Sequence, residues 1–197
     1  MPTTCGAAPA RSALLDLRPL RLDGLIEIRP ARFSDERGFF SETWSERALA
    51  DAGIHLHFVQ DNHSLSREVG VLRGLHFQSP PLAQDKLIRV TKGSVFDVAV
   101  DIRPGSPTYR QWEGLRLSAA EWNQLLIPKG FAHGFLALEP DCEVQYKVTA
   151  PYSREHDKAI RFDDPALGID WPMAAEALIL SDKDRAAALL ADIDTGF

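Results

Sequence analysis

Cysteine is scarce in this sequence: Cys5 and Cys142 are the only two among 197 residues. Two cysteines make neither a disulfide framework nor a cysteine-rich zinc site, so we expect a reduced protein of the cytoplasm. Apolar runs of the roughly 18–20 residues that span a bilayer are also missing. The first residues lack the basic and then apolar segments of a signal peptide. We therefore expect residues 1–17 to form a flexible leader and residues 18–197 a single domain.

Positive charge is also in deficit. Lys and Arg number 22 against 28 Asp and Glu, which gives a net charge of −6. This balance argues against nucleic acid or a membrane surface as a partner bound through overall charge. A local basic pocket for a phosphate-bearing ligand is still compatible with it.

Short alternating segments separated by turn residues are abundant. In residues 95–101, one face carries Phe96, Val98 and Val100, and the other carries Asp97, Ala99 and Asp101. Such segments recur at roughly 8–12-residue spacing, and this predicts a mainly β sandwich or barrel with strands at 25–33, 39–44 and 57–64 among others. We expect one short helix from Ser45 to Ala52 and one near residues 182–191. The chain after residue 162 should pack against the barrel.

Residues 71–78, Val-Leu-Arg-Gly-Leu-His-Phe-Gln, are the most informative segment. They are typical of a strand, yet they include Arg73 and His76, and burying either without a partner is costly. Strict alternation would put these two side chains on opposite faces. Gly74 lies between them and predicts a bulge that turns both toward one cavity.

Other polar residues support such a cavity. Lys86 opens the next strand, and Gln60 and Asn62 share one face of the preceding strand. Cations, an imidazole and amides inside a barrel favour an anionic, polar ligand. A lone strand histidine is more often structural than catalytic, so this context is what makes His76 a candidate base.

A second histidine raises the question of a metal. Residues 128–133, Pro-Lys-Gly-Phe-Ala-His, resemble the second motif of cupins, in which that His is often a metal ligand beside a His-x-His pair. Here Gln78 replaces the second His of the pair, and His76 and His133 alone are too few for a divalent metal. We predict no metal. His133 is either a hydrogen-bonded strand histidine or a pocket residue.

Tyr146 and Asp184 each allow two interpretations. Tyr146 alternates with Val144 and Val148, so it is either a core aromatic or a general acid facing the pocket. Asp184 follows Ser181 by three residues, as in a capping box, and a carboxylate suits the first turn of a helix. The residues alone favour capping for Asp184.

These motifs together resemble the dTDP-4-dehydrorhamnose 3,5-epimerases, cupin-fold enzymes of deoxysugar biosynthesis. The matching segments follow one another in order at residues 35–40, 58–64, 71–78, 95–103, 127–135, 168–172 and 181–184. The resemblance implies a cupin-type jelly-roll β-barrel with short peripheral helices, no cofactor, and a homodimer.

The resemblance also implies roles. His76 matches the family's catalytic base, Asp184 the partner of that base, Tyr146 the acid on the opposite ring face, and Lys86 the lysine near the enolate. Substrate contacts are implied for Glu42, Gln60, Asn62 and Arg73, and for Arg37, which in the family's dimer reaches the partner's nucleotide pocket. His133 matches the second-motif histidine and is grouped with the substrate-binding residues.

The chemistry of epimerisation next to a ketone explains why a base, an acid and a cation occur together in this set of residues. In a dTDP-linked 4-keto-6-deoxy sugar the protons at C3 and C5 are α to the ketone, and removing one gives an enolate at O4. A cation at that oxygen typically stabilises it by on the order of 3–4 kcal/mol. An imidazole suits the base, and inversion needs a second group on the other face. We therefore expect dTDP-4-keto-6-deoxyglucose to become dTDP-4-keto-rhamnose.

Other activities stay open. An enzyme that inverts only C3 or only C5 would use the same residues. A metal-dependent cupin oxygenase would hold a stoichiometric metal, and a sugar-binding cupin would bind without proton exchange. A sugar 3,4-ketoisomerase is less favoured by residues 73–78.

Overall fold

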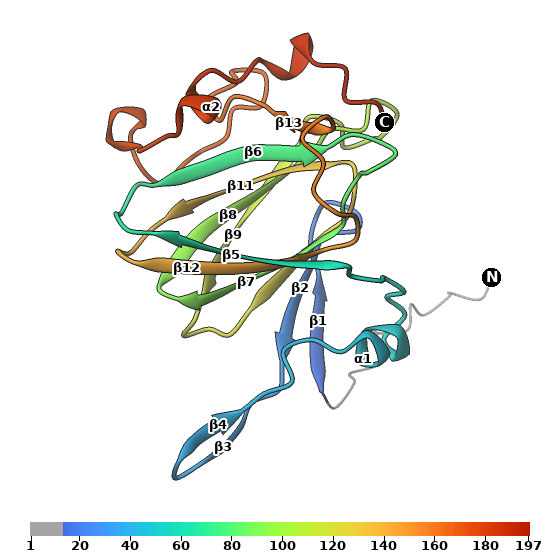
Figure 1. Cartoon of the computed structure of the whole chain (residues 1–197), viewed down its shortest axis with the longest axis vertical. Helices are drawn as coiled ribbons and strands as arrows, with labels where there is room; N and C mark the ends of the chain where they lie inside the picture. Colours follow the sequence, from blue (N-terminus) through green and yellow to red (C-terminus); the bar gives the residue numbers. More distant parts are fainter. Residues whose placement is uncertain (1–13) are drawn as a thin grey trace, which may run out of the picture.

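Two antiparallel β-sheets face each other in the computed structural model, which describes residues 14–197 (Figure 1). The larger sheet has six strands in the order β1 (Leu15–Pro19), β2 (Ile26–Pro30), β10 (Gln124–Ile127), β7 (Lys86–Lys92), β12 (Cys142–Val148) and β5 (Gln60–Ser66). The smaller has five in the order β13 (Asp157–Ala159), β6 (Leu72–Gln78), β11 (Phe131–Ala137), β8 (Ser94–Asp101) and β9 (Trp112–Ser118). This is the predicted cupin-type jelly-roll barrel.

The period-two pattern of the strands gives each sheet a face toward the other. Ile88 of β7 shares a buried cluster with Ala99 of β8 between the sheets. Val98 and Val100, on the opposite face of β8, share another cluster with Leu190. The predicted alternation in residues 95–101 is therefore confirmed. The C-terminal segment covers the outer face of the smaller sheet, as predicted, and Figure 1 shows it in orange and red above β6.

The predicted late helix over residues 182–191 is wrong in its length. Helix α2 spans only Asp182–Arg185, and single 3₁₀ turns occur at Ala175–Ala177 (η1) and Leu190–Asp192 (η2). After α2 the chain is held by hydrogen bonds to residues 161–164. The Arg161 N–H donates to the Ala188 carbonyl, and the Leu190 N–H donates to the Asp164 carboxylate at 2.7 Å. Packing on the sheet thus overrides the helix propensity of an Ala- and Leu-rich segment.

The first helix was predicted correctly. Helix α1 spans Glu46–Asp51, and its N-cap Ser45 accepts a hydrogen bond from the Ala48 N–H at 3.3 Å. Gly53 follows the helix with φ of +86°, a left-handed conformation that glycine adopts without strain. No helix within residues 14–197 is long and apolar enough to cross a membrane.

Four boundaries near the N-terminus differ from prediction. The strand expected at 25–33 spans only Ile26–Pro30. Leu15–Pro19 form β1, so the leader does not extend to residue 17; its residues 1–13 lie outside the described residues. The strand expected at 39–44 ends at Phe40, because the Ser41 hydroxyl donates to the Ala31 carbonyl and the Thr43 carbonyl accepts from Gln124, both outside any ladder. The strand expected from residue 57 starts at Gln60.

A short hairpin of β3 (Phe33–Asp35) and β4 (Gly38–Phe40) extends away from the barrel, as Figure 1 shows. Phe33, Phe39 and Phe40 on it are more than half exposed. Apolar side chains of this size, gathered on one projecting element, are typical of a surface that another protein chain covers.

The predicted irregularity at Gly74 is confirmed. The pairing of β6 with β11 shifts register between the His133–His76 and Phe135–Arg73 pairs. Gly74 has φ of +136°, and a Cβ there would lie 2.5 Å from the Gly134 Cα. Only glycine fits both the conformation and the space.

Candidate active site

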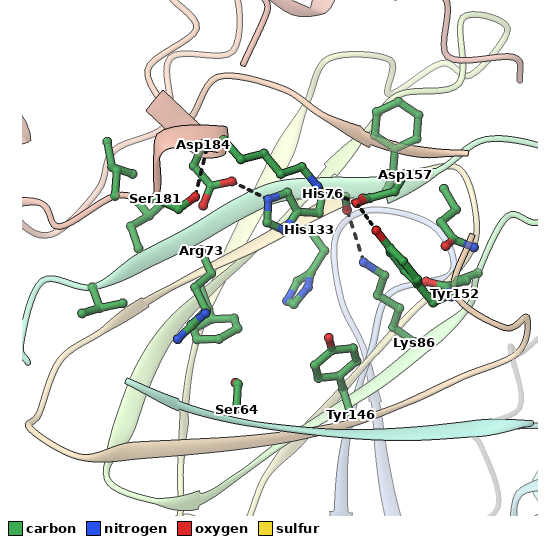
Figure 2. Close-up of a pocket in the computed structure, with 18 of the residues that line it drawn as sticks. Ser64, Arg73, His76, Lys86, His133, Tyr146, Tyr152, Asp157, Ser181 and Asp184 are labelled. Carbon is green, nitrogen blue, oxygen red and sulfur yellow. Dashed lines mark hydrogen bonds and ion pairs between the residues drawn. The ribbon is translucent and has the colours of Figure 1, made fainter. Parts of the chain in front are cut away.

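A cavity of about 480 Å³ opens between the sheets. Six of the predicted site residues line it: Arg73, His76, Lys86, His133, Tyr146 and Asp184. They come from β6, β7, β11, β12 and α2, and Figure 2 shows how they converge on one space. The bulge at Gly74 explains why Arg73 and His76, three positions apart on β6, both reach the cavity.

His76 and Asp184 form a tight pair. The His76 Nε2 lies 2.5 Å from the Asp184 Oδ1, and Asp184 is buried. Burial by itself would raise the pKa of the Asp184 carboxyl. Hydrogen bonds from His76, Ser181 and the Gly74 backbone, with the charge of His76, outweigh it and lower the pKa. The carboxylate is thus an ionised partner that fixes the orientation of the imidazole.

The capping interpretation of Asp184 is half right. Ser181 is the N-cap of α2, and its hydroxyl accepts the Asp184 backbone N–H at 3.1 Å. The Asp184 side chain, however, reaches His76 rather than serving the helix end alone. The cap therefore sets the position from which the carboxylate holds the imidazole.

Lys86 lies at the start of β7 with its ammonium in the cavity. Its Nζ donates to the His76 carbonyl at 3.2 Å, and the residue is buried. Burial lowers the pKa of Lys86 from 10.5 to about 8, against the opposing charges of Asp97 and Asp157. A cation this poorly solvated is strongly attracted to negative charge that forms beside it.

Tyr146 lies across the cavity from His76. Figure 2 shows its ring rising from β12 toward the space below His76 and Asp184. Burial raises the pKa of the phenol, although the charge of Arg73 works against the rise. The hydroxyl has no hydrogen bond to any residue in 14–197, so it is free to meet a bound ligand.

His133 satisfies both interpretations made from the sequence, because it is buried and hydrogen-bonded and also lines the cavity. Its Nε2 lies 2.9 and 3.0 Å from the two carboxylate oxygens of the fully buried Asp97. Burial lowers the pKa of His133, and the Asp97 charge opposes that shift. His133 is also the cross-strand neighbour of His76.

Arg73 offers a guanidinium without a carboxylate partner in the described chain. Its Nη2 donates to the Leu65 carbonyl at 3.0 Å, and its Nε donates more weakly to the Ser66 hydroxyl at 3.4 Å. Arg73 also lines the cavity, where a guanidinium without a carboxylate partner suits an anionic group.

Gln60 and Asn62 are not among the residues that line the cavity. They lie beside each other on β5, and the Gln60 amide donates to Asn62 at 2.8 Å. The Gln60 carbonyl oxygen accepts the Tyr152 N–H at 3.0 Å. Gln60 therefore holds the loop that presents Tyr152 to the cavity.

The structure does not bring Arg37 and Glu42 into the cavity of their own chain. Arg37 lies in the turn between β3 and β4, where it pairs with Asp35 and its side chain is 85% exposed. Glu42 is exposed after β4. Their place on and beside the projecting hairpin keeps both away from the barrel interior.

Sequence reasoning missed Tyr152, Asp157 and Lys183, which also line the cavity. Asp157 accepts hydrogen bonds from Lys183 at 2.6 Å and from the Tyr152 hydroxyl at 3.2 Å, so the three form a chain at the rim. Tyr152 lies in a loop and Asp157 opens the three-residue strand β13, too short to show a periodicity. Only Lys183 could have been identified from the sequence, because it directly precedes Asp184 in the matching segment 181–184.

The structure gives Gln78 a positioning role. Its amide donates to the carbonyls of Leu82 and Pro151, and its oxygen accepts the Ser153 N–H at 2.7 Å. Within residues 14–197 no three His, Cys, Asp or Glu side chains gather as metal ligands. The absence of a metal stays a prediction.

Comparison with known proteins gives a consistent picture. Residues 19–192 match the family described as dTDP-4-dehydrorhamnose 3,5-epimerase. A Sinorhizobium fredii protein of that name is 50% identical over 174 residues, which cover 86% of this chain and 87% of that protein.

Solved structures agree. A dTDP-6-deoxy-D-glucose-3,5-epimerase from Legionella pneumophila, in complex with dTDP-4-keto-L-rhamnose, matches with a TM-score of 0.86 and 49% identity over 91% of this chain and 95% of that one. ChmJ, a 3'-monoepimerase from Streptomyces bikiniensis in complex with dTDP-quinovose, matches with a TM-score of 0.82 and 33% identity over 88% and 87% of the two chains.

Proposed function

The chain belongs to the dTDP-4-dehydrorhamnose 3,5-epimerase family, and on that premise we propose that it inverts C3 and C5 of dTDP-4-keto-6-deoxyglucose to give dTDP-4-keto-rhamnose. The observation that carries the proposal is the His76–Asp184 pair on one wall of the cavity with the free Tyr146 hydroxyl on the other. Removal of a proton on one face and its return on the other need such a pair of groups.

His76 is the base. Its imidazole takes the proton from C3 or C5, and the electrons of the broken C–H bond move into the ketone, which becomes an enolate at O4. Asp184 is ionised and hydrogen-bonded to the imidazole, so it stabilises the imidazolium that forms. The abstracted proton stays on the imidazole and is not passed to the Asp184 carboxylate.

Lys86 stabilises the enolate. Its buried ammonium points into the cavity near the His76 backbone, where an oxygen next to the reacting carbons would lie. Charge that develops on that oxygen meets a cation that is already in place and largely free of water.

Tyr146 is the acid. Its hydroxyl returns a proton to the opposite face of the same carbon, and the resulting phenolate and the imidazolium re-equilibrate with solvent before the second carbon reacts. Burial raises the pKa of the phenol, so the hydroxyl keeps its proton until the enolate takes it.

Arg73 and Lys183 are the groups for the diphosphate. Both line the cavity, Arg73 has no carboxylate partner in residues 14–197, and Lys183 pairs only with Asp157 at the rim. Two cations at the mouth of the cavity suit a diphosphate despite the net charge of −6. His133, held by Asp97, contributes a rigid wall beside the sugar.

Arg37 and Glu42 act in a homodimer. They are exposed in their own chain, and the hairpin beside them carries exposed phenylalanines. In the proposed dimer the hairpin of one chain reaches the nucleotide end of the partner's cavity, where Gln60 and Asn62 also contact the substrate. The cytoplasmic location stays a prediction from the sequence.

A monoepimerase is the second candidate, and the match to the 3'-monoepimerase ChmJ favours it specifically. The two activities separate in one experiment. The chain is incubated with dTDP-4-keto-6-deoxyglucose in D₂O, and deuterium is located by NMR. Label at C3 and C5 supports the proposal, label at one carbon identifies a monoepimerase, and no label refutes epimerase activity on this substrate.

A further inference from the structure

A second His–Asp pair lies beside the pair assigned to proton removal. His133 of β11 is the cross-strand neighbour of His76 on β6, and its Nε2 lies 2.9 and 3.0 Å from the two carboxylate oxygens of Asp97 on β8. Three adjacent strands of the smaller sheet therefore carry the base and this second pair. The proposed reaction gives His133 only a place in the wall of the cavity, and it gives Asp97 no role of its own.

The buried carboxylate determines which nitrogen of His133 carries the proton. Asp97 is fully buried, and within residues 14–197 the imidazole is the one hydrogen-bond partner of its side chain. A buried carboxylate without a donor is costly, so the His133 Nε2 carries a hydrogen and donates it to Asp97. The nitrogen left for other contacts is Nδ1.

This free nitrogen is a hydrogen-bond acceptor. Burial lowers the pKa of His133; the charge of Asp97 opposes that shift, and the charges of Lys86 and His76 add to it. The ring is therefore neutral at pH 7. In a neutral imidazole with its hydrogen on Nε2, the Nδ1 carries a lone pair and can only accept.

The His133 Nδ1 has no donor in the described chain. It makes no hydrogen bond with any residue in 14–197, although the side chain is only 8% exposed. In this range Trp44 Nε1 is the one fully buried side-chain nitrogen or oxygen without a partner, so Nδ1 is open to the cavity that His133 lines. Figure 2 shows the ring extending into the space between His76 and Tyr146. An acceptor that is withdrawn from bulk water but open to the cavity requires a donor on the bound ligand.

Cross-strand geometry indicates which donor this is. Directly opposite residues of antiparallel strands have Cβ atoms roughly 4.5–5.5 Å apart, so the imidazoles of His76 and His133 face the same part of a bound sugar. In the proposed substrate the carbons beside the ketone are C3, which carries a hydroxyl, and C5, which carries a methyl group. The C3 hydroxyl is therefore the donor attached to a carbon on which His76 acts.

We propose that the His133 Nδ1 accepts a hydrogen bond from the C3 hydroxyl of the substrate, and that Asp97 is a positioning residue that holds His133 in the tautomer this contact needs. The inference rests on the proposed function and adds a determinant of specificity to it. An analogue without the hydroxyl leaves the buried acceptor unpaired, and a site built to bind a hydroxyl rejects such an analogue strongly. The pair thus selects 4-keto sugars that carry a free hydroxyl at C3.

The first test removes each partner of this hydrogen bond in turn. Wild type and His133→Gln each receive the proposed substrate and the analogue with hydrogen in place of the C3 hydroxyl, and kcat/KM for exchange at C5 in D₂O is followed by NMR. The Gln amide keeps a donor for Asp97 but puts no acceptor at the position of Nδ1. Wild type should lose at least about tenfold on the analogue. His133→Gln should treat the two compounds alike.

The second test addresses Asp97. In Asp97→Asn an amide N–H₂ faces the His133 Nε2, which moves the ring proton to Nδ1 and turns the acceptor into a donor. Nitrogen NMR of the full chain labelled with ¹⁵N-histidine should find the proton on Nε2 in wild type and on Nδ1 in the variant, which should also lose the preference for the hydroxylated compound. Asp101→Asn is the matched control, because Asp101 is an equally buried carboxylate on the same face of β8 that pairs with Arg103 outside the cavity. It should keep both the tautomer and the preference.

Equal exchange of the two compounds by wild type overturns the proposal, as does a loss of the same size in His133→Gln. A wild-type His133 with its proton on Nδ1, or a tautomer unchanged in folded Asp97→Asn, removes the role of Asp97. If wild type exchanges neither compound, the proposed function is at fault. The tautomers of wild type and Asp97→Asn are measured without substrate and still test Asp97; should Asp97→Asn fail to fold, the wild-type tautomer and the His133→Gln comparison decide.

Discussion

The ionisation of Lys86 makes the proposed reaction depend on pH in a defined direction. Burial lowers the pKa of this lysine from 10.5 to about 8. At 1.36 kcal/mol per unit, that shift means that the folded protein disfavours the charged form by roughly 3 kcal/mol. The penalty is fully present below pH 8 and disappears as the pH rises to 10.5, because the unfolded chain binds more protons in that interval. The charge that we propose for enolate stabilisation therefore destabilises the fold at neutral pH.

The assay is kcat/KM for epimerisation as a function of pH, since this ratio reports the free enzyme. We expect activity to fall above about pH 8 as the ammonium loses its proton. The fall in kcat alone should come at higher pH, because the bound diphosphate and the enolate raise the pKa of Lys86.

Two variants test the assignment. Lys86→Arg cannot lose its charge in this range and should lack the alkaline fall. Lys86→Met should lose about 10²–10³-fold in kcat while its thermal midpoint at pH 7 does not decrease. An unchanged alkaline fall in Lys86→Arg, or Lys86→Met within tenfold of wild type, would refute the reasoning.

Three further predictions concern the other groups. Asp184→Asn keeps the size of the side chain but not its charge, so kcat should fall by about 10²–10⁴-fold with little change in KM; a loss confined to KM would contradict the role given to the carboxylate. Tyr146→Phe should still exchange the first proton with D₂O but form inverted product far more slowly, and equal losses in both rates would remove Tyr146 as the acid. Gly74→Ala should lower the free energy of unfolding by about 1–3 kcal/mol in a urea titration, because its Cβ would lie 2.5 Å from the Gly134 Cα at a φ of +136°; a stability equal to wild type would show that β6 and β11 separate easily.

The sequence predicted the elements whose side-chain pattern is set locally. The alternation in β8 and the cap of α1 depend on neighbouring residues, and both are present in the structure. The bulge at Gly74 was also readable, because a glycine weakens the interior of a strand unless a bulge or a close backbone approach requires it. Where packing at long range decides, prediction failed: residues 186–191 have helical composition, yet the helix stops at Arg185. The Ala188 carbonyl accepts the Arg161 backbone N–H, and the Leu190 N–H donates to the Asp164 carboxylate, so this segment is held to the sheet instead.

For the candidate site, too, the sequence indicated what depends on local pattern and missed what depends on long-range contacts. Asp184 looked like a capping residue, and its contact with His76, 108 positions away, was implied only by the resemblance to a family. Tyr152 lies in a loop and Asp157 opens the three-residue strand β13, and neither segment is long enough or regular enough to show a periodicity from which to infer direction. Asp97 was placed on the correct face of its strand, but its pairing with His133 depends on how β8 and β11 are matched.

Hydrogen–deuterium exchange by His76→Ala tests the central claim most directly, because that claim assigns both proton removals to one imidazole. The substrate is incubated with the variant in D₂O, and exchange at C3 and at C5 is followed separately by NMR. His63→Ala is the control, since His63 is half-exposed on the outer face of β5 and pairs with Glu143. The account predicts that His76→Ala loses exchange at both carbons by at least about 10³-fold while remaining folded, and that His63→Ala keeps it. Exchange at either carbon at the wild-type rate in His76→Ala would contradict the account.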